Sequence, residues 1–168
     1  GDFEGFDASQ QAYLLESACW VLIQFSQFIF GKDLEAEKIM WAICDSLFHS
    51  YHVSGDNVFQ WLKSLPSGHY LTAIINSIFV LLALVITFLM ACEEQGIAPS
   101  EQQADAFFED NDVVAYGDDH CIAIARKYIS FYNQNTLVGL LLRLGLYYTD
   151  ELKTGTTVPD FRSIEEIS

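Results

Sequence analysis

The stretch Val113-Val114-Ala115-Tyr116-Gly117-Asp118-Asp119-His120-Cys121-Ile122-Ala123 decides how the whole chain is interpreted. Two short, apolar, β-prone runs flank the pair Gly117-Asp118, and this pattern predicts a tight β-hairpin. Two adjacent acids, Asp118 and Asp119, are unfavourable at its tip because like charges repel. A divalent cation would offset that repulsion, and Mg²⁺ prefers carboxylate oxygens combined with water and substrate phosphates. The hairpin therefore indicates a metal site.

A second acidic motif lies at the start of the chain. Asp2 and Asp7 are spaced D-x4-D within Asp2-Phe3-Glu4-Gly5-Phe6-Asp7, which is typical of a strand end that runs into a turn. If that strand end faces the hairpin, Asp2 adds a third carboxylate to Asp118 and Asp119. Three carboxylates of this kind suit two metal ions, which activate an attacking oxygen and stabilise a leaving one in phosphoryl transfer.

A third motif precedes the longest apolar stretch of the chain. Ser67 and Gly68 are followed by Thr72 and Asn76, spaced S-G-x3-T-x3-N. Gly68 gives a flexible backbone just before a helix, on which positions i and i+4 share one face. A hydroxyl and an amide on an otherwise apolar helix need polar partners when they are buried. Asp7 is the candidate partner, and together these groups suit the recognition of a ribose hydroxyl.

The rest of the pattern predicts helices that alternate with short strands. Apolar residues at helical spacing predict helices over residues 9–30, 33–48, 70–92 and 133–144. Turn residues at 54–57, between two β-prone runs, predict a second hairpin. We assign no helix or strand to the polar segment 93–112. This alternation predicts an α+β fold with a small antiparallel sheet.

Composition limits the function classes that remain. The chain has 168 residues, enough for about one domain, and 51% of them are hydrophobic, which excludes a disordered chain. With 8 basic and 23 acidic residues the formal charge is −15, so any contact with nucleic acid needs metal ions or basic segments outside this chain. The four cysteines are scattered, which favours neither a disulfide framework nor a zinc ribbon and fits an intracellular setting.

The apolar stretch 70–92 raises a membrane alternative. It carries no charge, but its uninterrupted apolar part covers only residues 78–92. At about 1.5 Å per residue that part spans roughly 22 Å, short of a hydrocarbon core of about 30 Å. A buried core helix is therefore favoured, and no transmembrane span is expected. A membrane-anchored interaction protein that spans at 70–92 is the alternative from a different function class.

Taken together, the three motifs resemble motifs A, B and C in the palm of the RNA-dependent RNA polymerases of positive-strand RNA viruses, in the picornavirus-like group. The resemblance covers essentially the whole chain, and a looser match to motif D lies in Gly145-Leu146-Tyr147-Tyr148-Thr149-Asp150-Glu151-Leu152-Lys153. It implies a palm with an RRM-like core, in which a small antiparallel sheet packs on helices, including a long apolar helix after the Ser-Gly loop. Residues 31–65 would be a fingers-side insertion, and the rest of the fingers and the thumb would lie outside these 168 residues.

The resemblance also implies catalytic roles for four residues. Asp2 and Asp118 would bind two Mg²⁺ ions, with Asp119 assisting and Mn²⁺ as a possible substitute. Lys153 would act as the general acid that protonates the pyrophosphate leaving group.

Five further residues would contact the substrates. Asp7 and Asn76, with Thr72 nearby, would recognise the 2′-hydroxyl of the incoming ribonucleotide. Ser67 and Gly68 would form a mobile loop that adjusts to the template and the nascent base pair.

The implied function is RNA-directed synthesis of RNA during viral genome replication. Its partners would be an RNA template and primer, nucleoside triphosphates, and the remaining fingers and thumb of the same polyprotein-derived polymerase. The implied location is the host cytoplasm, at membrane-associated replication complexes. A reverse-transcriptase-like palm is the alternative within the enzymes, but those carry a bulky aromatic residue where this chain has Asp7. We expect the 168 residues to be inactive alone, since they lack the basic fingers.

Overall fold

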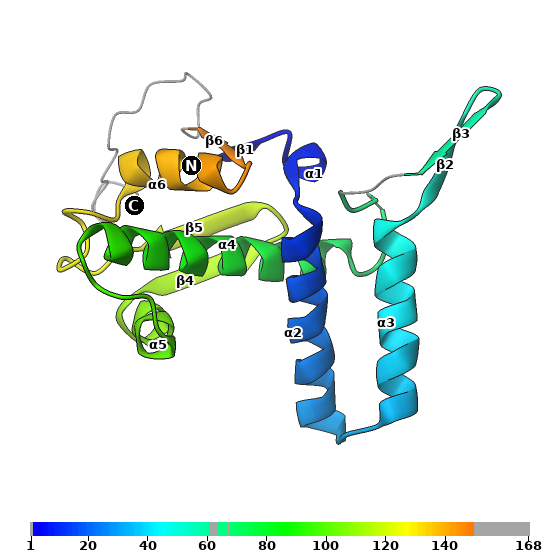
Figure 1. Ribbon diagram of the computed structural model, residues 1–168, viewed down its shortest axis with the longest axis horizontal. Coiled ribbons are helices and arrows are strands. Elements are labelled where there is room, and N and C mark those ends of the chain that lie inside the picture. The colour runs from blue at the N-terminus through cyan, green and yellow to red at the C-terminus, as the bar shows by residue number, and fades with distance from the viewer. Residues whose placement is uncertain (1, 61–63, 67, 150–168) are drawn as a thin grey trace, which may run out of the picture.

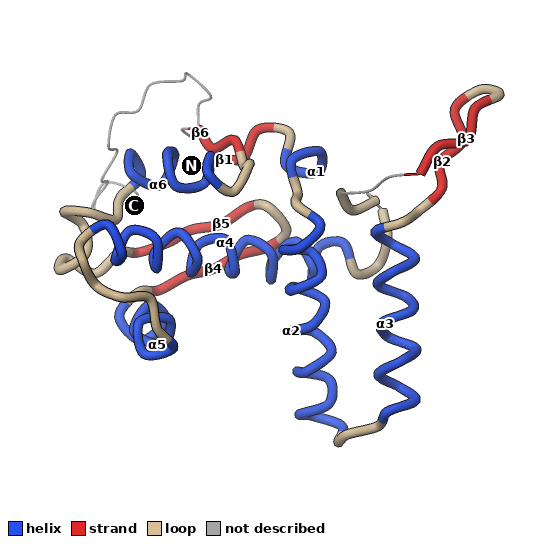
Figure 2. The backbone as a smooth tube through the Cα atoms, in the orientation of Figure 1, coloured by secondary structure: helices blue, strands red, loops and turns tan. Residues whose placement is uncertain are grey.

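A computed structural model describes residues 2–60, 64–66 and 68–149. Helices and strands alternate along this part of the chain (Figures 1 and 2). In chain order they are β1 (Asp2–Glu4), α1 (Phe6–Ser9), α2 (Ala12–Phe30), α3 (Leu34–Phe48), β2 (Tyr51–Ser54), β3 (Asn57–Gln60), α4 (Thr72–Glu94), α5 (Glu101–Asp110), β4 (Asp112–Tyr116), β5 (Asp119–Ala123), α6 (Gln134–Arg143) and β6 (Tyr147–Thr149).

The strands form antiparallel pairs, which confirms the predicted α+β class. In the described residues β1 pairs with β6, β2 with β3, and β4 with β5, each as a separate two-stranded sheet. The pairing of β1 with β6 joins the two ends of this part of the chain and places Phe3 opposite Tyr148. The predicted hairpin around Gly117 is present, with Tyr116 opposite Asp119.

Helix α4 is the central element of the fold. It lies across the β4–β5 hairpin, and α2, α5 and α6 also contact it (Figure 1). Eleven of its residues are buried, and only Asn76 and Thr87 among them are polar. Burying this much apolar surface, at about 25 cal/mol per Å², makes α4 the main source of core stability.

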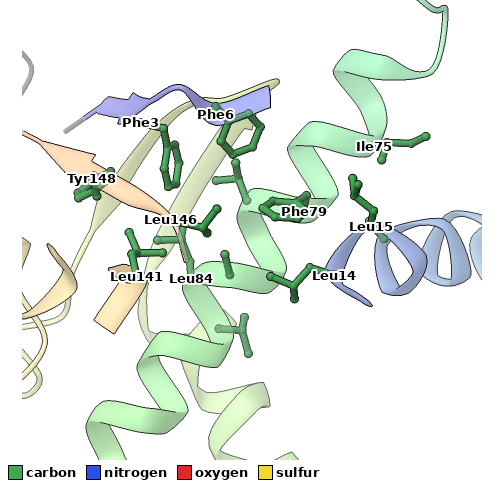
Figure 3. Packing of buried hydrophobic residues seen from close by; sticks show 14 of the residues in the cluster. Phe3, Phe6, Leu14, Leu15, Ile75, Phe79, Leu84, Leu141, Leu146 and Tyr148 are labelled. Carbon is green, nitrogen blue, oxygen red and sulfur yellow. The ribbon is translucent and has the colours of Figure 1, made fainter. Parts of the chain in front are cut away.

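Five aromatic side chains join the ends of the chain to α4 and to the hairpin, and we call them the aromatic junction: Phe3, Phe6, Phe79, His120 and Tyr148. The ring of Phe3 lies 4.9 Å from that of Phe6, 5.3 Å from His120 and 5.1 Å from Tyr148, measured between centroids. Phe6 in turn meets Phe79 edge-on at 5.5 Å. Figure 3 shows Phe3 and Phe6 side by side above Phe79 of α4. Each such pair adds about 0.5–1.5 kcal/mol beyond burial.

Local capping explains where several helices begin and end. Asp33 caps α3, as predicted, by accepting hydrogen bonds from the backbone N–H groups of Glu35 and Ala36. Asn133 and Thr136 form a capping box that starts α6. Gly145, at φ +78°, follows the end of α6, where a Cβ would lie 2.7 Å from Nε2 of Gln11. The close approach and the left-handed backbone both require glycine there.

Three predicted details differ from the structure. Helix α2 begins at Ala12 rather than at residue 9, because α1 ends at Ser9 and the backbone of Gln10 is extended. The segment 93–112 contains α5, which is mostly polar and has a single buried residue, Phe107. The helix predicted over residues 70–92 is α4, which begins at Thr72 and ends at Glu94.

Two helices, α2 and α4, are long and apolar enough to span a membrane by length and composition. This is weak support for a span, because core helices of soluble proteins have the same character. In α4 the apolar surface has another use, since it packs against other helices and the β4 strand.

The hydroxyl of Tyr132 gives a test of this core. Tyr132 is 1% exposed, and its hydroxyl donates a hydrogen bond to the Leu84 carbonyl of α4 at 2.9 Å. We expect Tyr132→Phe to lower the free energy of unfolding by about 1 kcal/mol, the usual net contribution of one hydrogen bond. The urea midpoint of the intact protein that contains this chain measures the loss. Tyr13→Phe, at a side chain that is 53% exposed, is the control and should leave the midpoint unchanged.

Candidate active site at the hairpin turn

A hydrogen bond from helix α4 holds the turn between β4 and β5. Gly117 is buried at φ +65°, a backbone conformation that favours glycine. Its N–H donates to Oγ of Ser77 at 2.8 Å, and the Ser77 hydroxyl itself donates to the Ala73 carbonyl at 2.7 Å. The turn is therefore anchored through Gly117, while the two acids that follow it, Asp118 and Asp119, are exposed.

The ring of His120 links the turn to the β1–β6 sheet. Its Nδ1 lies 3.0 Å from the Asp118 carbonyl, and its Nε2 lies 2.9 Å from the Tyr148 hydroxyl. A carbonyl only accepts, so Nδ1 carries the proton and donates to Asp118. Burial lowers the pKa of His120, which favours the neutral ring, so Nε2 accepts from the Tyr148 hydroxyl. The imidazole thus positions the backbone of the turn.

Asp2 lies on the strand that packs beside this turn. Phe3 contacts the His120 ring, and Asp2 directly precedes Phe3 on β1. The carboxylates of Asp119 and Asp2 are both near enough to His120 to raise its pKa, against the larger effect of burial. The structure therefore brings the start of the chain and the hairpin turn to the same imidazole.

The carboxylates at this site match the ligands that Mg²⁺ prefers. Asp118 and Asp119 offer exposed, hard oxygen atoms, and Asp2 is half-buried on β1. Mg²⁺ is commonly held by one or two carboxylates together with water and substrate phosphates. Within the described residues no three His, Cys, Asp or Glu side chains form a ready-made metal-binding group. The donor types of these side chains fit Mg²⁺.

The polar residues at the start of α4 have partners that the sequence analysis did not foresee. Thr72 donates its hydroxyl hydrogen bond to the Pro66 carbonyl at 2.9 Å, which ties the preceding loop to the helix. Asn76 accepts a hydrogen bond at Oδ1 from Nε2 of Gln10, at 2.7 Å. Gln10 is fully buried, and its Oε1 has no hydrogen-bond partner. Leaving such a group unpaired costs about 1–3 kcal/mol.

The remaining predicted site residues divide into two groups. Asp7 is exposed on α1, and Gly68 is exposed at φ +87° just before α4. Ser67 and Lys153 lie outside the described residues. Sequence analysis missed the roles of Gln10 and Ser77, although Ser77 directly follows the S-G-x3-T-x3-N motif.

Comparison with known proteins agrees with this geometry. A family model of viral RNA-dependent RNA polymerases matches residues 1–168. The chain belongs to this polymerase family. It is 34% identical to the replicase polyprotein of Cricket paralysis virus over 173 aligned positions, which cover 99% of this chain and 10% of that protein.

Other relatives support the same assignment. The replicase polyproteins of Drosophila C virus and Acute bee paralysis virus are 32% and 28% identical to the polymerase chain, in each case over 99% of its length. The polymerase chain spans about a tenth of the length of these relatives, covering 10% and 9% of them respectively.

The bond between Ser77 and Gly117 can be tested in the intact polymerase. Ser77→Ala removes the acceptor of the buried Gly117 N–H group. We expect the rate of primer extension to fall about tenfold. That factor corresponds to about 1.4 kcal/mol, within the range for leaving one buried donor unpaired. The Michaelis constant for nucleotide should change less, because Ser77 acts on the turn. Ser77→Thr keeps a hydroxyl and should restore most of the rate; an equal loss in both variants would contradict this role.

Proposed function

We propose that this chain forms the catalytic palm of an RNA-directed RNA polymerase that adds ribonucleotides to an RNA 3′ end. The observation that carries the proposal is the turn at Gly117, Asp118 and Asp119. It is anchored to α4 and linked through His120 to the strand that holds Asp2, in a chain that belongs to the viral polymerase family.

In the proposed mechanism the acidic residues bind metal and the metal binds phosphate. Asp2 and Asp118 would hold two Mg²⁺ ions, or Mn²⁺, with Asp119 assisting. Bound there, the ions would activate the primer 3′-hydroxyl and would neutralise charge on the pyrophosphate leaving group. This role is consistent with a chain of net charge −15, which would otherwise repel RNA.

Other residues of the chain would select and orient the nucleotide. Asp7 and Asn76, with Thr72 beside them on α4, would recognise the ribose 2′-hydroxyl. Ser67 and Gly68 would form the loop that adjusts to the template and the nascent pair; the positive φ of Gly68 is consistent with such a loop.

One further role is proposed for a residue near the end of the chain. Lys153 would donate the proton that the departing pyrophosphate takes up. This residue lies beyond β6, in the segment that follows Tyr147–Thr149.

The wider architecture follows from the same proposal. The β1 strand, the β4–β5 hairpin, α4 and α6 would form the RRM-like palm core, with residues 31–65 as a fingers-side insertion. The remaining fingers and the thumb would come from other parts of the same polyprotein, together with the basic groups that grip template, primer and nucleoside triphosphates. The assembly would work in the host cytoplasm at membrane-associated replication complexes, with no span through α4.

Two alternatives have less support. A reverse-transcriptase-like palm would exclude a 2′-hydroxyl with a bulky aromatic residue, and this chain has Asp7 there. A membrane-anchored interaction protein would need α4 free to face lipid, whereas Ile75, Phe79 and Leu84 are fully buried against other elements.

Replacement of one carboxylate tests the proposed catalysis. Asp118→Asn removes a metal-binding charge with little change in shape, and we expect primer extension by the intact polymerase to fall by more than about a hundredfold. Asp112→Asn, an exposed acid at the far end of the same hairpin, is the matched control and should keep the wild-type rate. Wild-type extension by Asp118→Asn would contradict the metal assignment.

Removal of the metal gives an independent test. Excess EDTA should abolish extension, and addition of Mg²⁺ or Mn²⁺ beyond the chelator should restore it, because carboxylate-held ions exchange with solvent. Mg²⁺ should also raise the melting temperature of the wild-type polymerase more than that of Asp118→Asn, since a ligand stabilises the state that binds it. Equal shifts in both proteins would place the bound ion elsewhere.

A further inference from the structure

We propose that Gln10 is a positioning residue for ribose selection, because it fixes which end of the Asn76 side-chain amide faces the nucleotide. The inference rests on the proposed function, in which Asn76 and Asp7 recognise the 2′-hydroxyl. It adds a residue that lies outside the polymerase motifs described above and acts through Asn76 rather than on the substrate itself.

The geometry of the pair supports this role. Gln10 follows α1 and is 0% exposed, and Asn76 in the first turns of α4 is 5% exposed. Nε2 of Gln10 donates to Oδ1 of Asn76 at 2.7 Å, a short hydrogen bond between two buried side chains 66 residues apart in sequence. Such a contact restricts the rotation of the Asn76 amide about its last bond, which is otherwise broad.

The polarity of this bond determines what Asn76 can offer to a ligand. An asparagine amide has an acceptor oxygen and a donor nitrogen on opposite sides. Since Gln10 occupies the oxygen, the Nδ2 donor is directed away from Gln10, and no described residue accepts a hydrogen bond from it. A donor suits the oxygen of a ribose 2′-hydroxyl, whose O–H can then donate a hydrogen bond to a carboxylate acceptor such as Asp7.

The unpaired oxygen of Gln10 argues against a purely structural role. Oε1 of Gln10 is buried and makes no hydrogen bond to any residue that the structure describes. Buried polar atoms are nearly always paired, and an apolar side chain of similar size would fill the same space without an unmet acceptor. The glutamine therefore reduces stability at this position, and the one bond that it makes goes to Asn76.

Gln10 also connects Asn76 to the segment that carries Asp7. Asp7 lies on the single turn of α1, which hydrogen bonds from Ala8 and Ser9 to the Gly5 carbonyl hold in place. The Ser9 hydroxyl donates to the Phe6 carbonyl at 3.0 Å, and Gln10 follows directly. A shift of Asp7 relative to α4 would therefore strain the bond between Gln10 and Asn76.

Two substitutions test the inference in the intact polymerase. Gln10→Met keeps the size of the side chain and removes its donor, whereas Gln10→Glu offers only acceptors and would turn the Asn76 nitrogen inward. The measurement is kcat/KM for one ribonucleotide and for its 2′-deoxy analogue on the same primer and template. We expect kcat/KM for the ribonucleotide, divided by kcat/KM for the 2′-deoxy analogue, to fall about tenfold in Gln10→Met, which is the effect of one hydrogen bond. The ratio should fall further in Gln10→Glu.

A neighbouring glutamine supplies the control. Gln11 is partly buried and donates to the Ser9 carbonyl, so Gln11→Met should leave the ratio unchanged. The melting temperature of Gln10→Met should stay near that of the wild type, because the substitution removes the unmet Oε1 of Gln10 but leaves Oδ1 of Asn76 without its donor. In an Asn76→Ala background, Gln10→Met should have no further effect on the ratio, since the group that it positions is absent.

The outcomes separate this inference from the proposed function. If Gln10→Met keeps the ratio while Asn76→Ala lowers it, Gln10 has no positioning role and the proposed function stands. Equal losses for both substrates, with a lower melting temperature, would show a structural role only and overturn the inference. If Asn76→Ala also keeps the ratio while Asp118→Asn abolishes extension, the ribose contact of Asn76 is wrong and the catalytic assignment stands.

Discussion

The site depends on the contact of Phe3 with His120. These rings, 5.3 Å apart, are the point where the first strand of the chain meets a hairpin more than a hundred residues later. The contact is apolar and buried on the side of Phe3, which is 3% exposed, and so does not depend on any charge at the site. It therefore holds the strand that carries Asp2 against the hairpin that carries Asp118 and Asp119.

Helix α4 provides the rigid support for both parts of the site. Within two adjacent residues it contacts the catalytic turn through Ser77 and the α1 segment through Asn76. Polar side chains on so apolar a helix are expensive to bury, which explains why each has a hydrogen-bond partner. The same packing that stabilises the core thus fixes the relative positions of the Gly117 turn and Asn76, the proposed ribose contact.

Periodicity and turn chemistry predict most of the fold from sequence. Asp33, Gly117 and Gly145 have conformations or contacts that follow from their residue type, and the helices and hairpins around them lie near their predicted places. Helix α5 was missed because most of its residues are polar and one, Phe107, is buried, although Ser100, which accepts from the N–H of Gln103, is a typical start signal for a helix.

The site was predictable only in its acidic part. Adjacent aspartates in a turn are a local signal, whereas the partner of Asn76 is set by tertiary packing across 66 residues of sequence. A buried glutamine such as Gln10 has no periodic pattern that distinguishes it from the exposed polar residues near a helix start. The role of Ser77 likewise depends on a contact with Gly117 that no spacing rule reveals.

The central claim is that Asp2 and Asp118 share bound cations, and cleavage by bound iron tests it most directly. Fe²⁺ replaces Mg²⁺ at carboxylate sites and, with ascorbate and peroxide, cuts the backbone close to the ion. The account predicts that the intact polymerase is cut both beside Asp2 and within the Gly117–Asp119 turn, and that Asp118→Asn or excess Mg²⁺ suppresses both cuts together. Cleavage at the turn alone, with none beside Asp2, would contradict it.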